Sequence, residues 1–145
     1  MDQPTNQDVT TCPECGAAWA HGMTCWEQLG GVIGWESEDP ELLAQHFLTV
    51  ACYNLQHPAQ FTDESIAWLR TSLIERLDRG TAVEELRRRA SRVYEGSKRV
   101  LRPESERKPV LRSWRMTISD VYIPDQSQGA AARVRAWAAG IRDEL

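Results

Sequence analysis

The sequence predicts an all-α protein, a small helical bundle with an N-terminal zinc-knuckle-like loop, and three observations support this prediction. Apolar residues recur at helical spacing, capping residues, prolines and glycines divide the chain into segments, and three cysteines lie close together near its beginning. With 145 residues the chain can bury a core without disulfides, so we expect a single domain over 1–145. Within it we expect a frayed tail over 1–10, a metal knuckle over 11–25 and the helical bundle over 26–145.

The first expected helix follows the cysteine-rich loop. Thr24 is a suitable cap, and the helical spacing of apolar residues continues to about Glu36. Gly30, Gly31 and Gly34 lower the helix propensity of this segment, and we expect them to let a neighbouring helix approach closely.

The second expected helix, over 40–57, is the one around which the rest of the chain is arranged. Pro40 suits the first helical position, and Pro58 ends the helix. At about 100° per residue, His46 and His57 lie only about 20° apart around the axis, on the side that carries most of the apolar residues. Both histidines are therefore expected to point into the protein. The remaining polar arc holds Glu41, Gln45, Thr49, Cys52 and Gln56.

Two more helices are expected in the middle of the chain. The first is capped by Thr62 or Asp63 and ends at Arg79–Gly80. The second begins with the capping box Thr81-x-x-Glu84 and is closed by Gly96.

The last third of the chain is expected to begin with a long connection. Residues 97–113 are basic and contain two prolines, which predicts a mobile loop. The pattern Thr117-x-x-Asp120 predicts one short helical turn or a strand, and a last helix begins near Ser127. The residues of this helix expected to face inward are Ala131, Val134, Trp137 or Ala138, and Ile141.

Charge is distributed unevenly, although the formal net charge is only −4. No Lys or Arg precedes Arg70, whereas ten of the 21 acidic residues do. The segment Arg87–Arg115 holds eleven of the 17 basic residues and three acidic ones, a net charge of +8 (11 − 3). Nucleic-acid binding is one interpretation, but only Tyr94 and Trp114 are interleaved with the arginines and the sequence pI is 5.4. We favour charge complementarity within the molecule or with a partner protein.

The sequence also predicts the environment of the protein. No apolar run is long enough to span a membrane, and residues 1–6 have neither the basic nor the apolar region of a signal peptide. We therefore expect a cytoplasmic protein with no membrane contact. In that reducing compartment the four cysteines are expected to remain thiols.

Cys12 and Cys15 have the C-x-x-C-G spacing of a zinc knuckle. Two thiolates at this spacing can hold one ion, and Gly16 permits the positive φ that such a turn needs. Cys25 follows ten positions after Cys15. A redox pair of the thioredoxin type is the usual competitor, but no strand pattern precedes these residues. We therefore favour Zn²⁺ as the cofactor over a redox pair or inert thiols.

The chain resembles a bacterial family, the domain-of-unknown-function family 5946. That pattern is C-x-x-C-G, a further Cys before an aromatic-rich helix, and then H-x-L-T-V-x-x-Y-x-x-Q-H-P. The matching residues are Cys12, Cys15, Gly16, Cys25, His46, Leu48, Thr49, Val50, Tyr53, Gln56, His57 and Pro58. Residues 134–138 are similar to its V-R-A-W-A ending. Relatives carry a His where this chain has Gly129 and Ala130. The resemblance therefore does not imply a catalytic metal site with three histidines. It also implies no particular activity.

A closed tetrahedral site needs a fourth ligand besides the three cysteines. The resemblance implies His57, which we favour. His21 would give the local pattern C-x₂-C-x₅-H-x₃-C, and His46 and Cys52 are further alternatives. One ion cannot take both His46 and His57, because eleven helical residues separate them by about 16 Å.

Two functions are open at this point. The favoured one is a metal-stabilised interaction module that binds a protein partner or associates with itself, with nucleic acid the less favoured partner. The alternative is a small metal-dependent, hydrolase-like enzyme with His46, Tyr53 and Gln56 lining a pocket. A catalytic zinc keeps one position open for water, and three cysteines with one histidine leave none.

Overall fold

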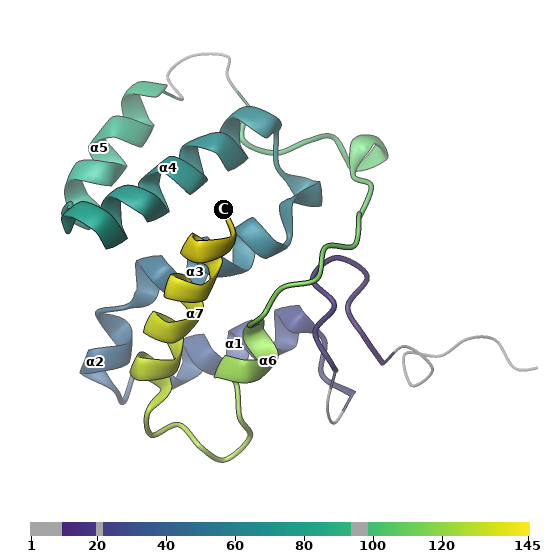
Figure 1. Ribbon diagram of the computed structural model, residues 1–145, viewed down its shortest axis with the longest axis vertical. Coiled ribbons are helices and arrows are strands. Elements are labelled where there is room, and N and C mark those ends of the chain that lie inside the picture. The colour runs from purple at the N-terminus through teal and green to yellow at the C-terminus, as the bar shows by residue number, and fades with distance from the viewer. Residues whose placement is uncertain (1–9, 20–21, 94–98) are drawn as a thin grey trace, which may run out of the picture.

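The computed structural model describes residues 10–19, 22–93 and 99–145, and over these ranges the protein is all-α, as the sequence predicts (Figure 1). Its α-helices are α1 (Cys25–Trp35), α2 (Pro40–Leu43), α3 (His46–Gln56), α4 (Asp63–Arg79), α5 (Val83–Val93), α6 (Ile118–Val121) and α7 (Ala130–Glu144). The short 3₁₀ turns are η2 (Pro58–Gln60) and η3 (Glu104–Glu106). Strand pairing in the described ranges is limited to two isolated bridges, Thr11 with Ala18 and Phe61 with Leu101.

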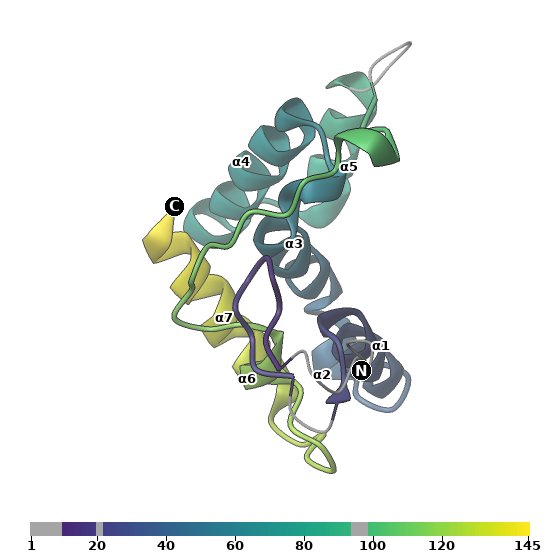
Figure 2. The ribbon, with the colours of Figure 1, turned by 90° about the vertical axis from the view of Figure 1, so that its right-hand side faces the viewer.

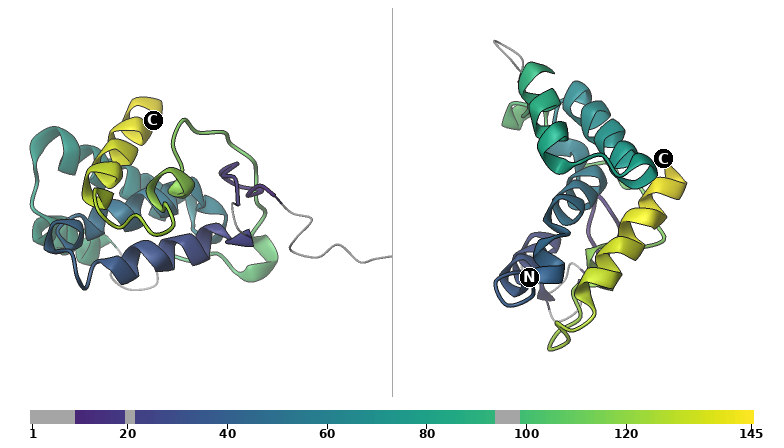
Figure 3. Two further views of the ribbon diagram at one scale, coloured as in Figure 1. Left: turned by 90° about the horizontal axis from the view of Figure 1, so that it is seen from below. Right: turned by 90° about the vertical axis from the view of Figure 1, so that its left-hand side faces the viewer.

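Helix α3 is the centre of the arrangement. It packs against both α4 and α7. Helices α4 and α5 lie toward one end of the molecule, and α1, α2 and α6 lie toward the other (Figures 1 and 2). Helix α7 runs alongside α3 (Figure 3). The inward face predicted for α7 is confirmed, because all its members are buried: Ala131, Val134, Trp137, Ala138 and Ile141.

The helix predicted over 40–57 is in fact two helices. Ala44 and Gln45 form a turn that separates α2 from α3, and the fully buried Leu42 lies on α2, which packs against α7. The polar arc predicted for this helix is also wrong. Because α3 is covered on more than one side, three members of that arc are fully buried, namely Thr49, Cys52 and Gln56.

Capping residues set several helix boundaries where the sequence predicts them. Thr24 and Thr117 each form a capping box with the acidic residue three positions later. These boxes confirm the start of α1 and identify α6 as a helical turn rather than a strand. Thr62 caps α4, and Gly80 ends it with a φ of +68° that most side chains avoid.

Two predicted boundaries are corrected. The Thr81 capping box does not form, because α5 begins at Val83 and the Thr81 hydroxyl donates to the Glu75 carboxylate. Helix α7 begins at Ala130, later than Ser127, after a glycine in the left-handed region. Gly96, expected to close α5, lies outside the described residues.

From residue 99 to residue 117 the chain between α5 and α6 has no regular structure apart from η3, and hydrogen bonds attach it to the rest of the protein. The Arg102 N–H donates to the Gln60 carbonyl in η2, and the Arg112 N–H donates to the Glu14 carbonyl in the N-terminal loop. This connection therefore lies beside both segments. No helix in the described ranges has the length and apolar character that crossing a bilayer would require.

Candidate metal centre

The C-x-x-C-G segment folds into a tight turn. The Cys12 N–H donates to the Ala17 carbonyl at 2.9 Å, and the Gly16 N–H donates to the Cys12 carbonyl at 3.0 Å. Gly16 has a φ of +76°, a conformation that a residue with a Cβ adopts only with strain. This local geometry directs the Cys12 and Cys15 side chains into the protein, where both are buried.

Two other elements bring one ligand each to the same place. Cys25 is the first residue of α1, held by the Thr24 cap, and His57 follows the last residue of α3. One ligand atom from each of Cys12, Cys15, Cys25 and His57 lies within 4.8 Å of all the others, and all four residues are buried.

The spacing fits one tetrahedral ion. Cys15 Sγ and Cys25 Sγ are 3.6 Å apart, as are Cys12 Sγ and His57 Nε2. Ligands at about 2.3 Å from a tetrahedral centre are separated by about 3.8 Å, so these distances suit a shared ion. All four cysteines are free thiols in the structure. The cluster is therefore positioned to hold a metal ion.

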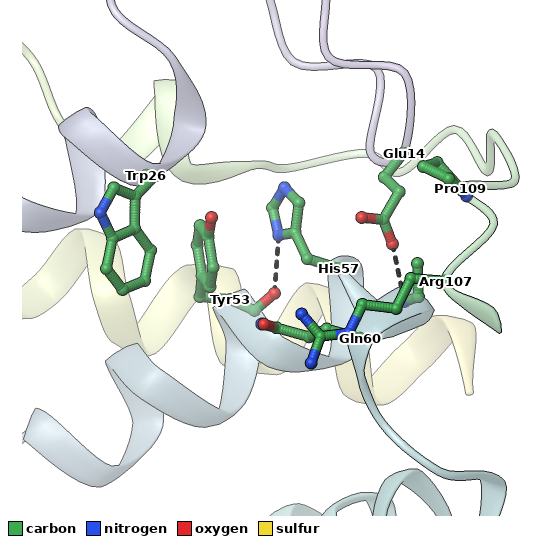
Figure 4. Close-up of a pocket in the computed structure, with 8 residues that line it drawn as sticks. Glu14, Trp26, Tyr53, His57, Gln60, Arg107 and Pro109 are labelled. Carbon is green, nitrogen blue, oxygen red and sulfur yellow. Dashed lines mark hydrogen bonds between the residues drawn. The ribbon is translucent and has the colours of Figure 1, made fainter. Parts of the chain in front are cut away.

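The orientation of His57 is fixed by its own helix. The His57 Nδ1–H donates to the Tyr53 carbonyl at 2.7 Å, and the two rings stack with centroids 4.1 Å apart (Figure 4). A carbonyl can only accept, so Nδ1 carries a proton and Nε2, which faces Cys12, is the nitrogen with a free lone pair in the neutral ring. Metal-ligating histidines are commonly held in this way.

Hydrogen-bond donors surround the sulfur atoms. The backbone N–H groups of Glu14 and Cys15 donate to Cys12 Sγ at 3.4 and 3.5 Å. The Trp19 indole N–H donates to Cys25 Sγ at 3.3 Å. Such donors stabilise negative charge on sulfur and so favour the thiolate that binds metal.

Mutual contact also shifts the proton affinities of these groups. Hydrogen bonds from Cys15 and Cys25 lower the pKa of Cys12, and the same contact with Cys12 raises the pKa of Cys15. Burial lowers the pKa of His57, but hydrogen bonds to Cys12 and Cys25 outweigh it and raise that pKa to about 10. A divalent cation would compete with these shared protons for the same ligand atoms.

The other candidate ligands lie elsewhere or cannot be described. The prediction that His46 is buried is wrong, since its side chain is 43% exposed and its Nδ1 lies 2.8 Å from a carboxylate oxygen of the buried Glu36. Cys52 is fully buried apart from the cluster, and burial raises the pKa of its thiol. His21 lies outside the described residues.

The residues expected to line an enzyme pocket are not brought together. Tyr53 lines a pocket beside the cluster, whereas His46 and Gln56 do not. The Gln56 amide donates to the Met116 carbonyl at 2.7 Å and accepts the Trp137 indole N–H at 3.1 Å. Gln56 therefore joins α3 to α7 and to the residue preceding the α6 cap.

Sequence reasoning missed two residues that support the site. Trp19 donates to Cys25, and the Glu14 carboxylate accepts the Ala59 N–H at 3.0 Å, which ties the cysteine turn to η2. Nothing in the local pattern marks either residue. The role of the Tyr53 carbonyl could have been found, because Tyr53 and His57 are four residues apart on a helix.

Comparison with known proteins identifies a family. No curated protein and no solved structure matches the chain. A family described only as "Family of unknown function (DUF5946)" matches residues 10–145. Because that match covers nearly the whole chain, the protein belongs to the DUF5946 family.

Proposed function

We propose that this protein is a zinc-stabilised helical interaction module in which Cys12, Cys15, Cys25 and His57 hold one structural Zn²⁺. The observation that carries the proposal is the convergence of four buried ligand atoms, from the N-terminal turn, α1 and the end of α3, within 4.8 Å of one another. Three thiolates and an imidazole in tetrahedral spacing are the ligand set that Zn²⁺ takes in structural sites.

A structural role follows from the closed ligand set. Four protein ligands leave no position for a water molecule, and catalytic zinc sites keep one. Of the residues considered for an enzyme, His46 pairs with Glu36 and Gln56 with Met116 and Trp137. These pairings support the interaction module over the hydrolase-like alternative.

The metal would add a strong link between the N-terminal turn and two helices. Residues 10–19 contain no helix and contribute only small side chains, such as Ala17, and the cysteines to the buried core, with Trp19 partly buried against it. A shared ion would attach this turn to α1 and α3, and its binding free energy would add to folding stability.

The surface favours a protein partner or self-association over nucleic acid. Several arginines of Arg87–Arg115 already have partners within the chain: Arg88 and Arg89 pair with Glu85, and Arg102 pairs with Asp63. Exposed apolar side chains accompany the basic ones along the connection, and Val110 and Leu111 are 77% and 60% exposed. Such a mixed surface is typical of protein interfaces.

Metal analysis of the purified chain tests the zinc site. We expect one Zn²⁺ per chain, lost in Cys15→Ser and kept in the control Cys52→Ser, whose sulfur lies outside the cluster. Replacement of zinc by Co²⁺ should give the visible absorption of a tetrahedral thiolate complex. A purified wild-type protein without metal would contradict the proposal. So would a water molecule bound to the metal that small anions or other metal ligands can displace.

The interaction role has its own test. Fluorescence anisotropy with short RNA and DNA across a salt series should show no tight binding at physiological salt, and sedimentation should show any self-association. Tight binding that weakens steeply with salt would identify nucleic acid as the partner instead.

A further inference from the structure

We propose that the pocket beside the metal cluster binds a small zwitterion with an aromatic body, of which an aromatic α-amino acid is the simplest example. This pocket has a volume of about 420 Å³, within the range of about 300–1,000 Å³ typical of small-molecule sites. Its lining comes from four separate parts of the chain: the cysteine turn, α1, the end of α3 with η2, and the connection after η3.

One wall of the pocket is aromatic. Trp26 on α1 is 69% exposed, and in the described part of the chain it is the one aromatic residue that is largely exposed. Its ring meets the Tyr53 ring edge to face, with centroids 6.1 Å apart, and Tyr53 in turn stacks on His57 (Figure 4). The edge-to-face contact with Tyr53, and the stacking of Tyr53 on His57, place an exposed indole face at the edge of the pocket.

The opposite side is polar and has unused hydrogen-bonding capacity. The Arg107 Nε–H donates to the Arg102 carbonyl, which orients the guanidinium, but the two terminal nitrogens have no partner among the described residues. The side-chain amide of Gln60 and the hydroxyl of Tyr53 also lack one there. Arg107 and Gln60 both line this pocket, together with Tyr53 and His57 (Figure 4).

The charges decide the class of ligand. Glu14 lines the same pocket, one of its carboxylate oxygens accepts the Ala59 N–H, and no ion pair joins it to Arg107 within the described ranges. A purely anionic ligand would meet the Glu14 carboxylate, and a purely cationic one would meet Arg107. A ligand with both an ammonium group and a carboxylate satisfies both, while its aromatic body covers Trp26.

Three probes of similar shape test this inference on the metal-loaded protein by isothermal titration calorimetry. Phenylalanine carries both charges, phenethylamine only the cation and 3-phenylpropanoate only the anion. Because each charge-assisted contact is worth about tenfold or more in affinity, phenylalanine should bind at least roughly tenfold more tightly than either analogue.

Variants locate the binding. Arg107→Gln should reduce phenylalanine affinity roughly tenfold but should not weaken phenethylamine, which has no carboxylate for Arg107 to bind. Glu14→Gln should likewise reduce phenylalanine affinity roughly tenfold but should not weaken 3-phenylpropanoate, which has no ammonium group. Trp26→Ala should weaken all three probes, and the exposed Arg87→Gln on α5 serves as control. If Glu14→Gln does not fold, Arg107→Gln and Trp26→Ala still test whether the ligand binds in this pocket.

Equal binding of the three probes, no phenylalanine binding at millimolar concentration, or a phenylalanine affinity unaffected by Arg107→Gln would overturn the proposal. Metal content measured in parallel separates this outcome from a failure of the zinc site. A variant that keeps its metal and loses the ligand reports on the pocket alone.

Discussion

Gln56 and His57 are adjacent in sequence but are expected to have separable roles, and Gln56→Leu distinguishes them. Gln56 is 1% exposed and makes two hydrogen bonds, a partly buried one to the Met116 carbonyl at 2.7 Å and a buried one from the Trp137 indole at 3.1 Å. Leucine has a similar volume and can make neither. The substitution therefore leaves the buried Trp137 donor and the partly buried Met116 acceptor without partners.

The magnitude follows from these two groups. Each buried polar group left unsatisfied costs about 1–3 kcal/mol, or about 2–6 kcal/mol for two. The apolar leucine side chain regains roughly 1–2 kcal/mol by its own burial. We expect a net loss of about 1–4 kcal/mol, a large part of the roughly 5–15 kcal/mol that stabilises a typical domain.

Urea unfolding of the metal-loaded protein, followed by circular dichroism, measures this loss. In a double-mutant cycle, Trp137→Phe should destabilise the Gln56→Leu variant less than it destabilises the wild-type protein. The reason is that the indole donor has already lost its acceptor in Gln56→Leu. Gln45→Leu, at a partly exposed position without a side-chain cap, should change stability by less than about 0.5 kcal/mol. Unchanged stability in Gln56→Leu, or loss of its metal, would refute the reasoning.

Further variants test the neighbouring contacts. His57→Ala should lose the metal, whereas His46→Ala should keep it and lose about 1–2 kcal/mol, because the buried Glu36 carboxylate then lacks its partner; metal analysis and urea unfolding separate the two effects. Chelation of the metal should lower the melting temperature by several degrees, and an unchanged melting curve would argue against a structural site. Gly31→Ala should cost about 1–3 kcal/mol because the new methyl group would overlap the Tyr122 ring, which stacks on Trp35. Gly30→Ala, which meets nothing, should instead gain up to about 1 kcal/mol in the same unfolding assay.

Features that depend on neighbouring residues in the chain were predictable from the sequence. The capping boxes at Thr24 and Thr117 form as their spacing indicates. The turn that holds Cys12 and Cys15 likewise follows from residues next to one another, including the glycine that adopts positive φ. Each of these is determined within a few residues. The predicted capping box at Thr81 shows the limit of such patterns, because there the hydroxyl donates to Glu75 in the preceding helix instead.

Features that depend on distant contacts were not predictable in the same way. The helical wheel of 40–57 assumes one buried side, but α3 is packed between α4 and α7, so polar residues such as Thr49 are buried too. The turn at Ala44 and Gln45 has no local signal, since both residues suit a helix. That His57 lies near the cysteines was implied by the family resemblance, because the periodicity alone treated His46 and His57 as equivalent.

The end of α3 shows why the contacts of a short segment are difficult to predict from a single sequence. Gln56 faces Trp137 and Met116, His57 faces the cysteines, and Pro58 begins the η2 turn. Within η2, the Ala59 N–H donates to the Glu14 carboxylate, and the Gln60 carbonyl accepts from the Arg102 N–H. Five consecutive residues thus contact the C-terminal helix, the cysteine turn and the connection after α5. A change in metal occupancy is therefore expected to reach the walls of the neighbouring pocket, since His57 belongs to both the cluster and the pocket, and the pocket residue Glu14 lies between Cys12 and Cys15 in the cysteine turn.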